Sequence, residues 1–236
     1  MNNLMNFIRL HKNWRDLLPN SPFNLIIKDD EDYSDVYLFK YNQYESDMNN
    51  IICQEARGII LEIKEIYDTE RQVRLLCHSF DKFFNHCAPQ GLQVLDEFNW
   101  CDYSFQEKRD GSLLRMWYYN DKWNISTSGT IDAFKASIDI PSCPYSSFGQ
   151  MFKEIYDSYN ENVELDDGIT YSFELTSPDN KIVVDYDKNE LTLIGMRCNY
   201  INEEVDPIYN NPFKNIKVAE RFQYISLKDA LNHINN

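Results

Sequence analysis

No stretch of this 236-residue sequence approaches the roughly 18 consecutive apolar residues that a membrane-spanning helix needs. The N-terminus also lacks a signal-peptide pattern, because polar residues begin within two positions of Met1. The sequence therefore predicts an intracellular, cytoplasmic protein with no membrane partner.

A C-x-x-C pair is missing as well, so neither a disulfide framework nor a zinc ribbon is indicated. Two Cys/His pairs, Cys77-His78 and His86-Cys87, hold adjacent side chains instead of the spacing of two to four residues that is typical of zinc sites. We expect six free thiols, and the protein ligands of any metal are unknown from the sequence alone. The cysteines are Cys53, Cys77, Cys87, Cys101, Cys143 and Cys198.

Basic residues are too few to balance the acidic ones. The sequence has 23 Lys and Arg against 38 Asp and Glu, which gives a net charge of -15. Such a charge repels a polyanion at long range and opposes non-specific binding of nucleic acid. A nucleic-acid function therefore requires a local basic cleft, or a separate domain or partner that delivers the substrate.

Large side chains that bury well are abundant. The sequence is 43% hydrophobic and holds 16 Tyr and 14 Phe, which excludes the disordered class. Strand-like runs follow one another through short turns instead of alternating with helices. This order predicts an α+β fold with mainly antiparallel sheets and flanking helices. We expect one domain that spans residues 1–236.

Periodicity places the individual elements. Helical spacing predicts a leading amphipathic helix within residues 1–19 that ends before Pro19. The clearest hairpin joins residues 112–119 to residues 123–128. Further helices are predicted over residues 146–159 and from Ser226, a candidate cap, to the end. Other strands are predicted over residues 23–27, 33–41, 58–63, 73–78, 170–176, 181–185 and 191–196.

A lysine lies just before the first strand of this hairpin, in Glu107-Lys108-Arg109-Asp110-Gly111-Ser112. A lysine amine is nucleophilic only when it is deprotonated, and a neighbouring cation such as Arg109, or a bound metal, favours the neutral form. Attack of Lys108 on a nucleotide α-phosphate would give a phosphoramidate. Gly111 allows a sharp turn and a close approach to a ligand. The alternative is an ordinary Asp-Gly turn with charged flanks.

The surrounding blocks favour the nucleophile. Residues 108–112 have the K-x-D-G-S form of motif I of covalent nucleotidyltransferases, the group of DNA ligases, RNA ligases and capping enzymes. Residues 56–62 and 79–85 upstream, and residues 171–183 and 193–197 downstream, resemble the phage-type RNA ligase 1 family in order and spacing. Four blocks in sequence are far more specific than one pentapeptide.

The resemblance implies a function and a set of site residues. The fold would be the nucleotidyltransferase, or ATP-grasp-like ligase, fold. Lys108 would take AMP from ATP with Mg²⁺ present, pass it to an RNA 5′-phosphate and allow a 3′-hydroxyl to seal the strand, in RNA or tRNA repair. The source could then be a virus or a phage. The implied nucleotide-binding residues are Glu107, Arg57, Lys82, Phe84, Gly111 and Glu174.

Two departures from the family pattern qualify this prediction. Ser128 stands where the family usually has an active-site lysine, and Lys122 or Lys135 would have to substitute for it. The family pattern also continues into motifs IV and V, an E-G-x-V strand and a K-x-K strand, whereas this sequence ends at Asn236. We expect a fold that is incomplete at the C-terminus, with the missing strands in a longer polypeptide or a second chain. Self-adenylylation by this chain alone should be weak or absent.

A second class of function competes with the ligase. In it, the chain is a truncated or degenerate nucleotidyltransferase-like module that binds nucleotide or RNA without ligating. Ser128 and the missing motifs favour the module, whereas Lys108, Arg57 and Glu174 oppose it. A DNA ligase or a capping enzyme is disfavoured, because residues 79–85 resemble the RNA ligase branch.

Overall fold

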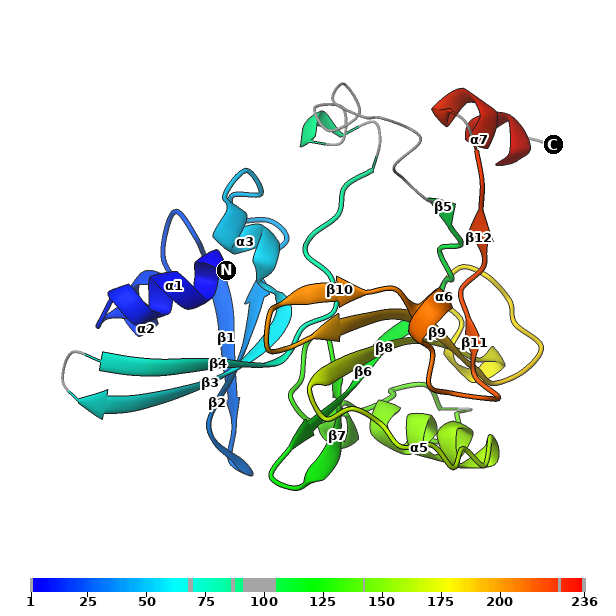
Figure 1. The fold of residues 1–236 in the computed structure, drawn as a ribbon, viewed down its shortest axis with the longest axis horizontal. Helices are drawn as coiled ribbons and strands as arrows, with labels where there is room; N and C mark the ends of the chain where they lie inside the picture. Colours follow the sequence, from blue (N-terminus) through cyan, green and yellow to red (C-terminus); the bar gives the residue numbers. More distant parts are fainter. Residues whose placement is uncertain are drawn as a thin grey trace.

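The computed structural model describes residues 2–67, 70–85, 88–90, 105–141, 143–224 and 226–234. Two antiparallel sheets lie side by side and carry helices on their outer faces (Figure 1). The predicted α+β class with mainly antiparallel sheets is therefore confirmed. Among the described residues, no helix has both the length and the apolar composition to cross a membrane.

The first sheet has the strand order β1-β2-β3-β4. Its strands are β1 (Leu25–Asp30), β2 (Tyr33–Tyr41), β3 (Arg57–Tyr67) and β4 (Glu70–Cys77). Helices α1 (Asn3–Leu10), α2 (Trp14–Leu17) and α3 (Ile51–Glu55) cover one face (Figure 1). Leu4, Ile8 and Trp14 bury against Phe39 and Leu61 there. The carboxylate of Glu55 accepts hydrogen bonds from the backbone of Asn3 and Leu4, which fixes the start of α1.

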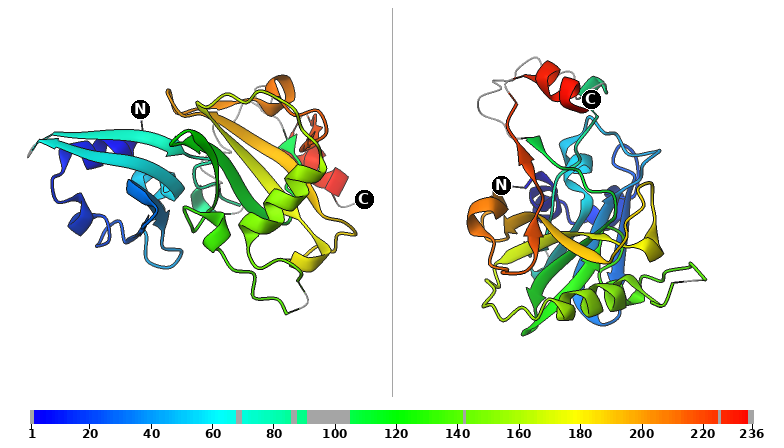
Figure 2. Two further views of the ribbon diagram at one scale, coloured as in Figure 1. Left: turned by 90° about the horizontal axis from the view of Figure 1, so that it is seen from below. Right: turned by 90° about the vertical axis from the view of Figure 1, so that its right-hand side faces the viewer.

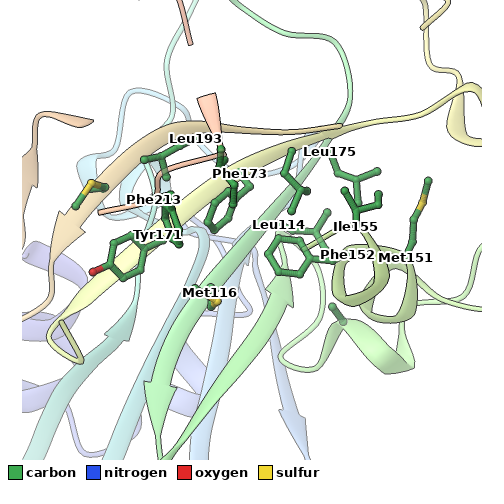
Figure 3. Close-up of a cluster of buried hydrophobic side chains, with 14 of the residues drawn as sticks. Leu114, Met116, Met151, Phe152, Ile155, Tyr171, Phe173, Leu175, Leu193 and Phe213 are labelled. Carbon is green, nitrogen blue, oxygen red and sulfur yellow. The ribbon is translucent and has the colours of Figure 1, made fainter. Parts of the chain in front are cut away.

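The second sheet has the order β10-β9-β8-β6-β7, with β11 parallel to β9. Its strands are β6 (Ser112–Tyr119), β7 (Lys122–Thr127), β8 (Ile169–Thr176), β9 (Glu190–Cys198), β10 (Glu203–Val205) and β11 (Lys217–Val218). Helix α5 (Phe148–Ser158) places Phe152 and Ile155 against Leu114 and Phe173 of the sheet (Figure 3).

The remaining elements lie outside these two sheets. They are β5 (Phe105–Gln106) and its partner β12 (Arg221–Phe222), the helices α6 (Pro207–Asn210) and α7 (Leu227–Ile234), and the short 3₁₀ helices η2 (Ala133–Lys135) and η3 (Pro178–Asn180). The β5–β12 pair leads away from the second sheet towards α7, as the two views of Figure 2 also show.

Apolar side chains from both sheets meet between them. Leu38 and Ile60 of the first sheet pack with Trp117 of the second and with Ile131, which follows β7. The side chain of Arg115 on β6 is 0% exposed and lies in the same contact between the sheets. It donates hydrogen bonds to Gly58 O on β3 and to Thr127 O on β7. The sheets are therefore joined by a small apolar core, by the buried guanidinium of Arg115 and by hydrogen bonds from the hydroxyls of Tyr33 and Tyr119 to Asn124 and Glu62.

Most predicted elements are present, and two predictions were wrong. Asn120 and Asp121 adopt the positive φ angles of 51° and 56° that a tight hairpin turn requires, so the hairpin is confirmed. Residues 181–185 do not form a strand. The leading helix is also not continuous. It ends at Leu10, and a second helix begins at Trp14, whose side chain packs in the core.

The thiols and the final helix agree with expectation where the structure describes them. Cys53, Cys77, Cys143 and Cys198 are free, whereas Cys87 and Cys101 lie outside the described residues. The backbone N–H of Asp229 donates to the Ser226 hydroxyl over 3.1 Å, as expected for the cap of α7.

We expect Arg115→Ala to lower the free energy of unfolding by about 3 kcal/mol, because it leaves two buried carbonyls without donors and opens a cavity. Arg15→Ala is the control, because Arg15 is exposed and donates to Tyr37 at the surface. It should cost less than about 1 kcal/mol. Urea unfolding of both variants measures the difference. Equal costs would show that Arg115 does not join the sheets.

Candidate active site

A large open cleft runs between the two sheets. Its volume is about 1180 Å³, somewhat more than the roughly 300–1,000 Å³ of most small-molecule pockets. The end of β2, the start of β3, the segment that enters β6, the end of β7 and Glu174 of β8 all line it. Five of the predicted site residues meet there, and they are Arg57, Glu107, Lys108, Gly111 and Glu174.

Lys108 is exposed in the short segment between β5 and β6. The carboxylate of Asp110 fixes this segment, because it accepts hydrogen bonds from the backbone of Val183 and Val184 over 2.7 and 2.8 Å. These bonds hold the pKa of Asp110 below its ordinary value. They also explain why residues 181–185 are not a strand, since these amides bind a carboxylate instead of a neighbouring strand.

Gly111 brings the Lys108 segment against β8. Its backbone N–H donates to Glu174 Oε1 over 3.0 Å. A Cβ atom at Gly111 would lie 2.3 Å from the carbonyl oxygen of Leu175, so no larger residue fits without a shift of the backbone. The glycine is therefore required for the close approach of the two segments.

Glu174 is half-buried at the edge of the cleft. Burial raises the pKa of Glu174 to about 7, and the Gly111 N–H and the positive charges of Lys108 and Arg57 only partly oppose this effect. A carboxyl group with such a pKa, held beside a lysine in a cleft, is typical of a functional site.

Arg57 begins β3 at an irregular point of the sheet. The register with β2 skips Gly58, whose φ is +77° and whose Cβ would lie 2.7 Å from the carbonyl oxygen of Ser128. The guanidinium of Arg57 lies 4.3 Å from the ring centre of Phe83. Its Nη1 atom is buried and has no hydrogen-bond partner within the described part of the chain. A donor in this state can serve an anionic ligand.

Arg109 does not act as an unpaired cation beside Lys108. Its guanidinium contacts Glu107 Oε1 at 3.3 Å and Glu190 Oε2 at 3.0 Å, and it stacks on the ring of Tyr186. The expectation that Arg109 provides positive charge to the amine of Lys108 is not supported by this geometry, because two carboxylates already share that charge.

Lys82 and Phe84 do not line the cleft. The amine of Lys82 lies 5.3 Å from the ring centre of Phe84 and 5.8 Å from that of Tyr41. Phe83, which is 50% exposed, lines the cleft in their place. Successive side chains in an extended segment point to opposite sides. Because Phe83 points towards Arg57 and the cleft, Lys82 and Phe84 point away from it. Neither Phe83 nor Phe84 belongs to an apolar core cluster of the described residues.

The two lysines expected to replace a lysine at Ser128 do not reach the cleft. Lys122 lies over the ring of Tyr33, and Lys135 forms ion pairs of 2.6 Å with both Asp30 and Asp32. Lys40 does line the cleft, and the sequence prediction missed it. The only sequence signal was its alternation with apolar residues along a strand.

No cluster of three or more His, Cys, Asp or Glu side chains suited to a metal occurs in the described ranges. His78 is fully buried beside Asn202, and Cys77 contacts Ser126. His86 and Cys87, the other half of the zinc alternative, lie outside the described residues.

Comparison with known proteins identifies the class. The phage T4-type RNA ligase family, described as RNA ligase, matches residues 55–231, and this range holds all the cleft residues predicted from the sequence. The chain therefore belongs to this RNA ligase family.

Two relatives are more specific. A protein of Autographa californica nuclear polyhedrosis virus, provisionally described as a bifunctional polynucleotide kinase/RNA ligase, is 26% identical over 215 residues, which are 84% of this chain and 29% of that protein. The RNA ligase of Rhodothermus phage RM378 is 26% identical over 188 residues, 69% of this chain and 41% of that protein. The chain thus spans less than half of either relative.

The structure is similar to that of an archaeal ATP-dependent RNA ligase, and the superposition covers 89% of this chain and 50% of the archaeal chain. The TM-score is 0.47 at 9% identity, so nothing about the site follows from this likeness.

We expect Glu174→Gln to change the pH dependence of stability. The folded protein holds a proton on Glu174 between about pH 4.5 and 7 that the unfolded chain releases, so the free energy of unfolding falls as the pH rises through this window. The variant should lack this fall and be more stable than the parent at pH 7.5, by up to about 3 kcal/mol. Urea unfolding at several pH values measures it, with exposed Glu164→Gln as the control. Parallel profiles for parent and Glu174→Gln would contradict the prediction.

Two glycines test the packing of the Lys108 segment. Gly111→Ala should lower the free energy of unfolding by about 1–3 kcal/mol, because the new methyl group meets the Leu175 carbonyl. Gly129→Ala should change it by less than about 0.5 kcal/mol, since a Cβ there meets only Lys40 Nζ, at 3.9 Å. Thermal unfolding measures both, and an equal effect of the two changes would refute the close approach.

Proposed function

We propose that the chain is the adenylate-accepting part of an ATP-dependent RNA ligase. The amine of Lys108 attacks the α-phosphorus of ATP, a P–N bond forms, and the bond to the pyrophosphate leaving group breaks. The AMP then passes to an RNA 5′-phosphate, and a 3′-hydroxyl displaces it to seal the strand. The observation that carries this proposal is the Gly111–Glu174 hydrogen bond, which holds the Lys108 segment beside a half-buried carboxyl group.

The other cleft residues fit a nucleotide. Glu174 offers a carboxylate that can accept hydrogen bonds from ribose hydroxyls. The unpartnered Nη1 of Arg57 is suited to a phosphate oxygen. Glu107, whose backbone N–H is fixed by Glu220 O at 2.8 Å, lies at the same edge of the cleft and is proposed to contact the adenine.

Magnesium belongs to the proposal because ATP is used as a magnesium complex. The ion commonly takes few protein ligands and many phosphate or water oxygens. No protein ligand is assigned to the ion, because the described residues hold no cluster of acidic side chains suited to a metal.

RNA ends are the proposed substrate, with tRNA repair as one setting. Four basic residues line the cleft against three acidic ones, so the net charge of -15 does not extend into it. A single excess positive charge is weak for RNA binding. We therefore propose that a second domain or chain delivers the RNA. Both named relatives are longer proteins, from a virus and a phage. An intracellular site of action and a viral or phage source are part of this proposal.

A non-ligating nucleotide-binding module is the second candidate, because Ser128 lines the cleft where the family usually has a lysine. The two candidates differ in whether a covalent bond to Lys108 forms.

We expect incubation with magnesium and ATP labelled at the α-phosphate to give a low yield of acid-labile label on the denatured protein. Lys108→Ala should remove the label. Lys108→Arg should remove it too, because a guanidinium stays protonated and is not a nucleophile. Lys122→Ala should keep it, since Lys122 lies outside the cleft. Nucleotide binding without any label would favour the module, and label that persists in Lys108→Ala would exclude Lys108 as the acceptor.

A further inference from the structure

Two cations face the cleft from neighbouring strands. Lys40 of β2 and Arg57 of β3 are direct cross-strand partners at the bulge made by Gly58. Both line the cleft. Two cations that line one cleft from paired strands can act on the same bound anion, and each favours its binding.

The strand directs Lys40 into the cleft. Val36 and Leu38 lie on the face of β2 that packs against the second sheet, whereas Tyr37 and Phe39 pack on the opposite face. Side chains alternate along a strand, so Lys40 continues the face of Val36 and Leu38. That face passes from the core between the sheets directly into the cleft.

The amine of Lys40 lies against the turn that carries Ser128. A Cβ atom built on Gly129 would lie 3.9 Å from Lys40 Nζ. Lys28 holds the same turn, because its amine donates to the carbonyl oxygen of Gly129 over 2.7 Å. Lys40 is therefore next to the position where the family usually supplies a lysine.

The charge of Lys40 is not neutralised within the described part of the chain. Its amine forms no ion pair there, whereas Lys135 is held by two aspartates and Arg109 by two glutamates. Arg57 also keeps one buried donor atom without a partner. Among the basic residues that line the cleft, Lys40 and Arg57 are thus the two available for an anion besides Lys108.

We infer that Lys40 and Arg57 form a subsite for the β- and γ-phosphates of the nucleotide, in which Lys40 provides the positive charge that Ser128 cannot. The inference rests on the proposed function, which puts the α-phosphate at Lys108 and the ribose at Glu174. The remaining charged part of ATP is its terminal diphosphate, which is also the leaving group. A cation at this place stabilises the charge that develops on the leaving pyrophosphate.

Equilibrium binding of ATP, AMP and inorganic tripolyphosphate tests the subsite. We expect the parent protein to bind ATP more tightly than AMP. Lys40→Met keeps the aliphatic stem and removes the charge, so it should weaken ATP and tripolyphosphate binding roughly tenfold or more and leave AMP binding within about twofold. Lys122→Met is the matched control and should bind all three as the parent does.

A second substitution separates electrostatics from folding. In the Lys40→Met background, Ser128→Lys should restore the preference for ATP over AMP, because it returns a cation to the adjoining turn. Equal binding of ATP and AMP by the parent would overturn the inference. So would an equal loss of ATP and AMP binding in Lys40→Met.

The covalent label on Lys108 is measured separately and keeps the two proposals distinguishable. If no label forms but the ATP preference depends on Lys40, the subsite stands and the ligase proposal fails. If label forms and Lys40→Met leaves the ATP preference unchanged, the ligase proposal stands and the subsite fails.

Discussion

Arg115 reaches from β6 to the carbonyl oxygen of Gly58 on β3, and this hydrogen bond joins the two sheets, while a second bond to the carbonyl oxygen of Thr127 ties the same guanidinium to β7. Burial lowers the pKa of Arg115, and the described residues offer it carbonyl groups but no carboxylate partner. Each carbonyl belongs to a neighbour of a cleft residue, because Arg57 precedes Gly58 and Ser128 follows Thr127. The Arg115 guanidinium therefore ties together the backbone segments that carry Arg57 and Ser128 on the two sides of the site. The bulge at Gly58 is the local adjustment that permits it.

The chain is acidic as a whole, yet its cleft can bind an anion, because the cleft is lined by more basic than acidic side chains. About half of the lysines and arginines away from the cleft are paired with carboxylates, as Lys135 illustrates, and within the cleft Arg109 is paired as well. Lys40 and Arg57 differ, since their strands bring them into the cleft without such partners among the described residues. The site can therefore attract a small, highly charged nucleotide at short range. RNA is longer and more sensitive to the overall charge, which is why its delivery is assigned to a further domain or chain.

Local patterns were sufficient for most of the fold, because alternation and turn residues such as Asn120 act over a few positions. They failed at residues 181–185. This segment has the composition of a strand, but the amides of Val183 and Val184 bind the carboxylate of Asp110, about 70 residues earlier in the sequence. The motif around Lys108 was readable since its residues are contiguous. Lys40 was not, because its role depends on cross-strand register and on a turn almost 90 residues later in the chain. The sequence likewise does not distinguish Phe83 from Phe84, because the difference between them is the contact of Phe83 with Arg57, a residue of another segment.

The central claim is that Lys108 is the amine that receives AMP. Peptide mass spectrometry of the protein after prolonged incubation with ATP and magnesium tests it most directly, because it locates the modified residue without any substitution. We predict one adenylyl group, carried by the peptide that contains Lys108 and lost on treatment with acid. An adenylyl group on another lysine, or a Lys108 peptide that stays wholly unmodified, would contradict the account.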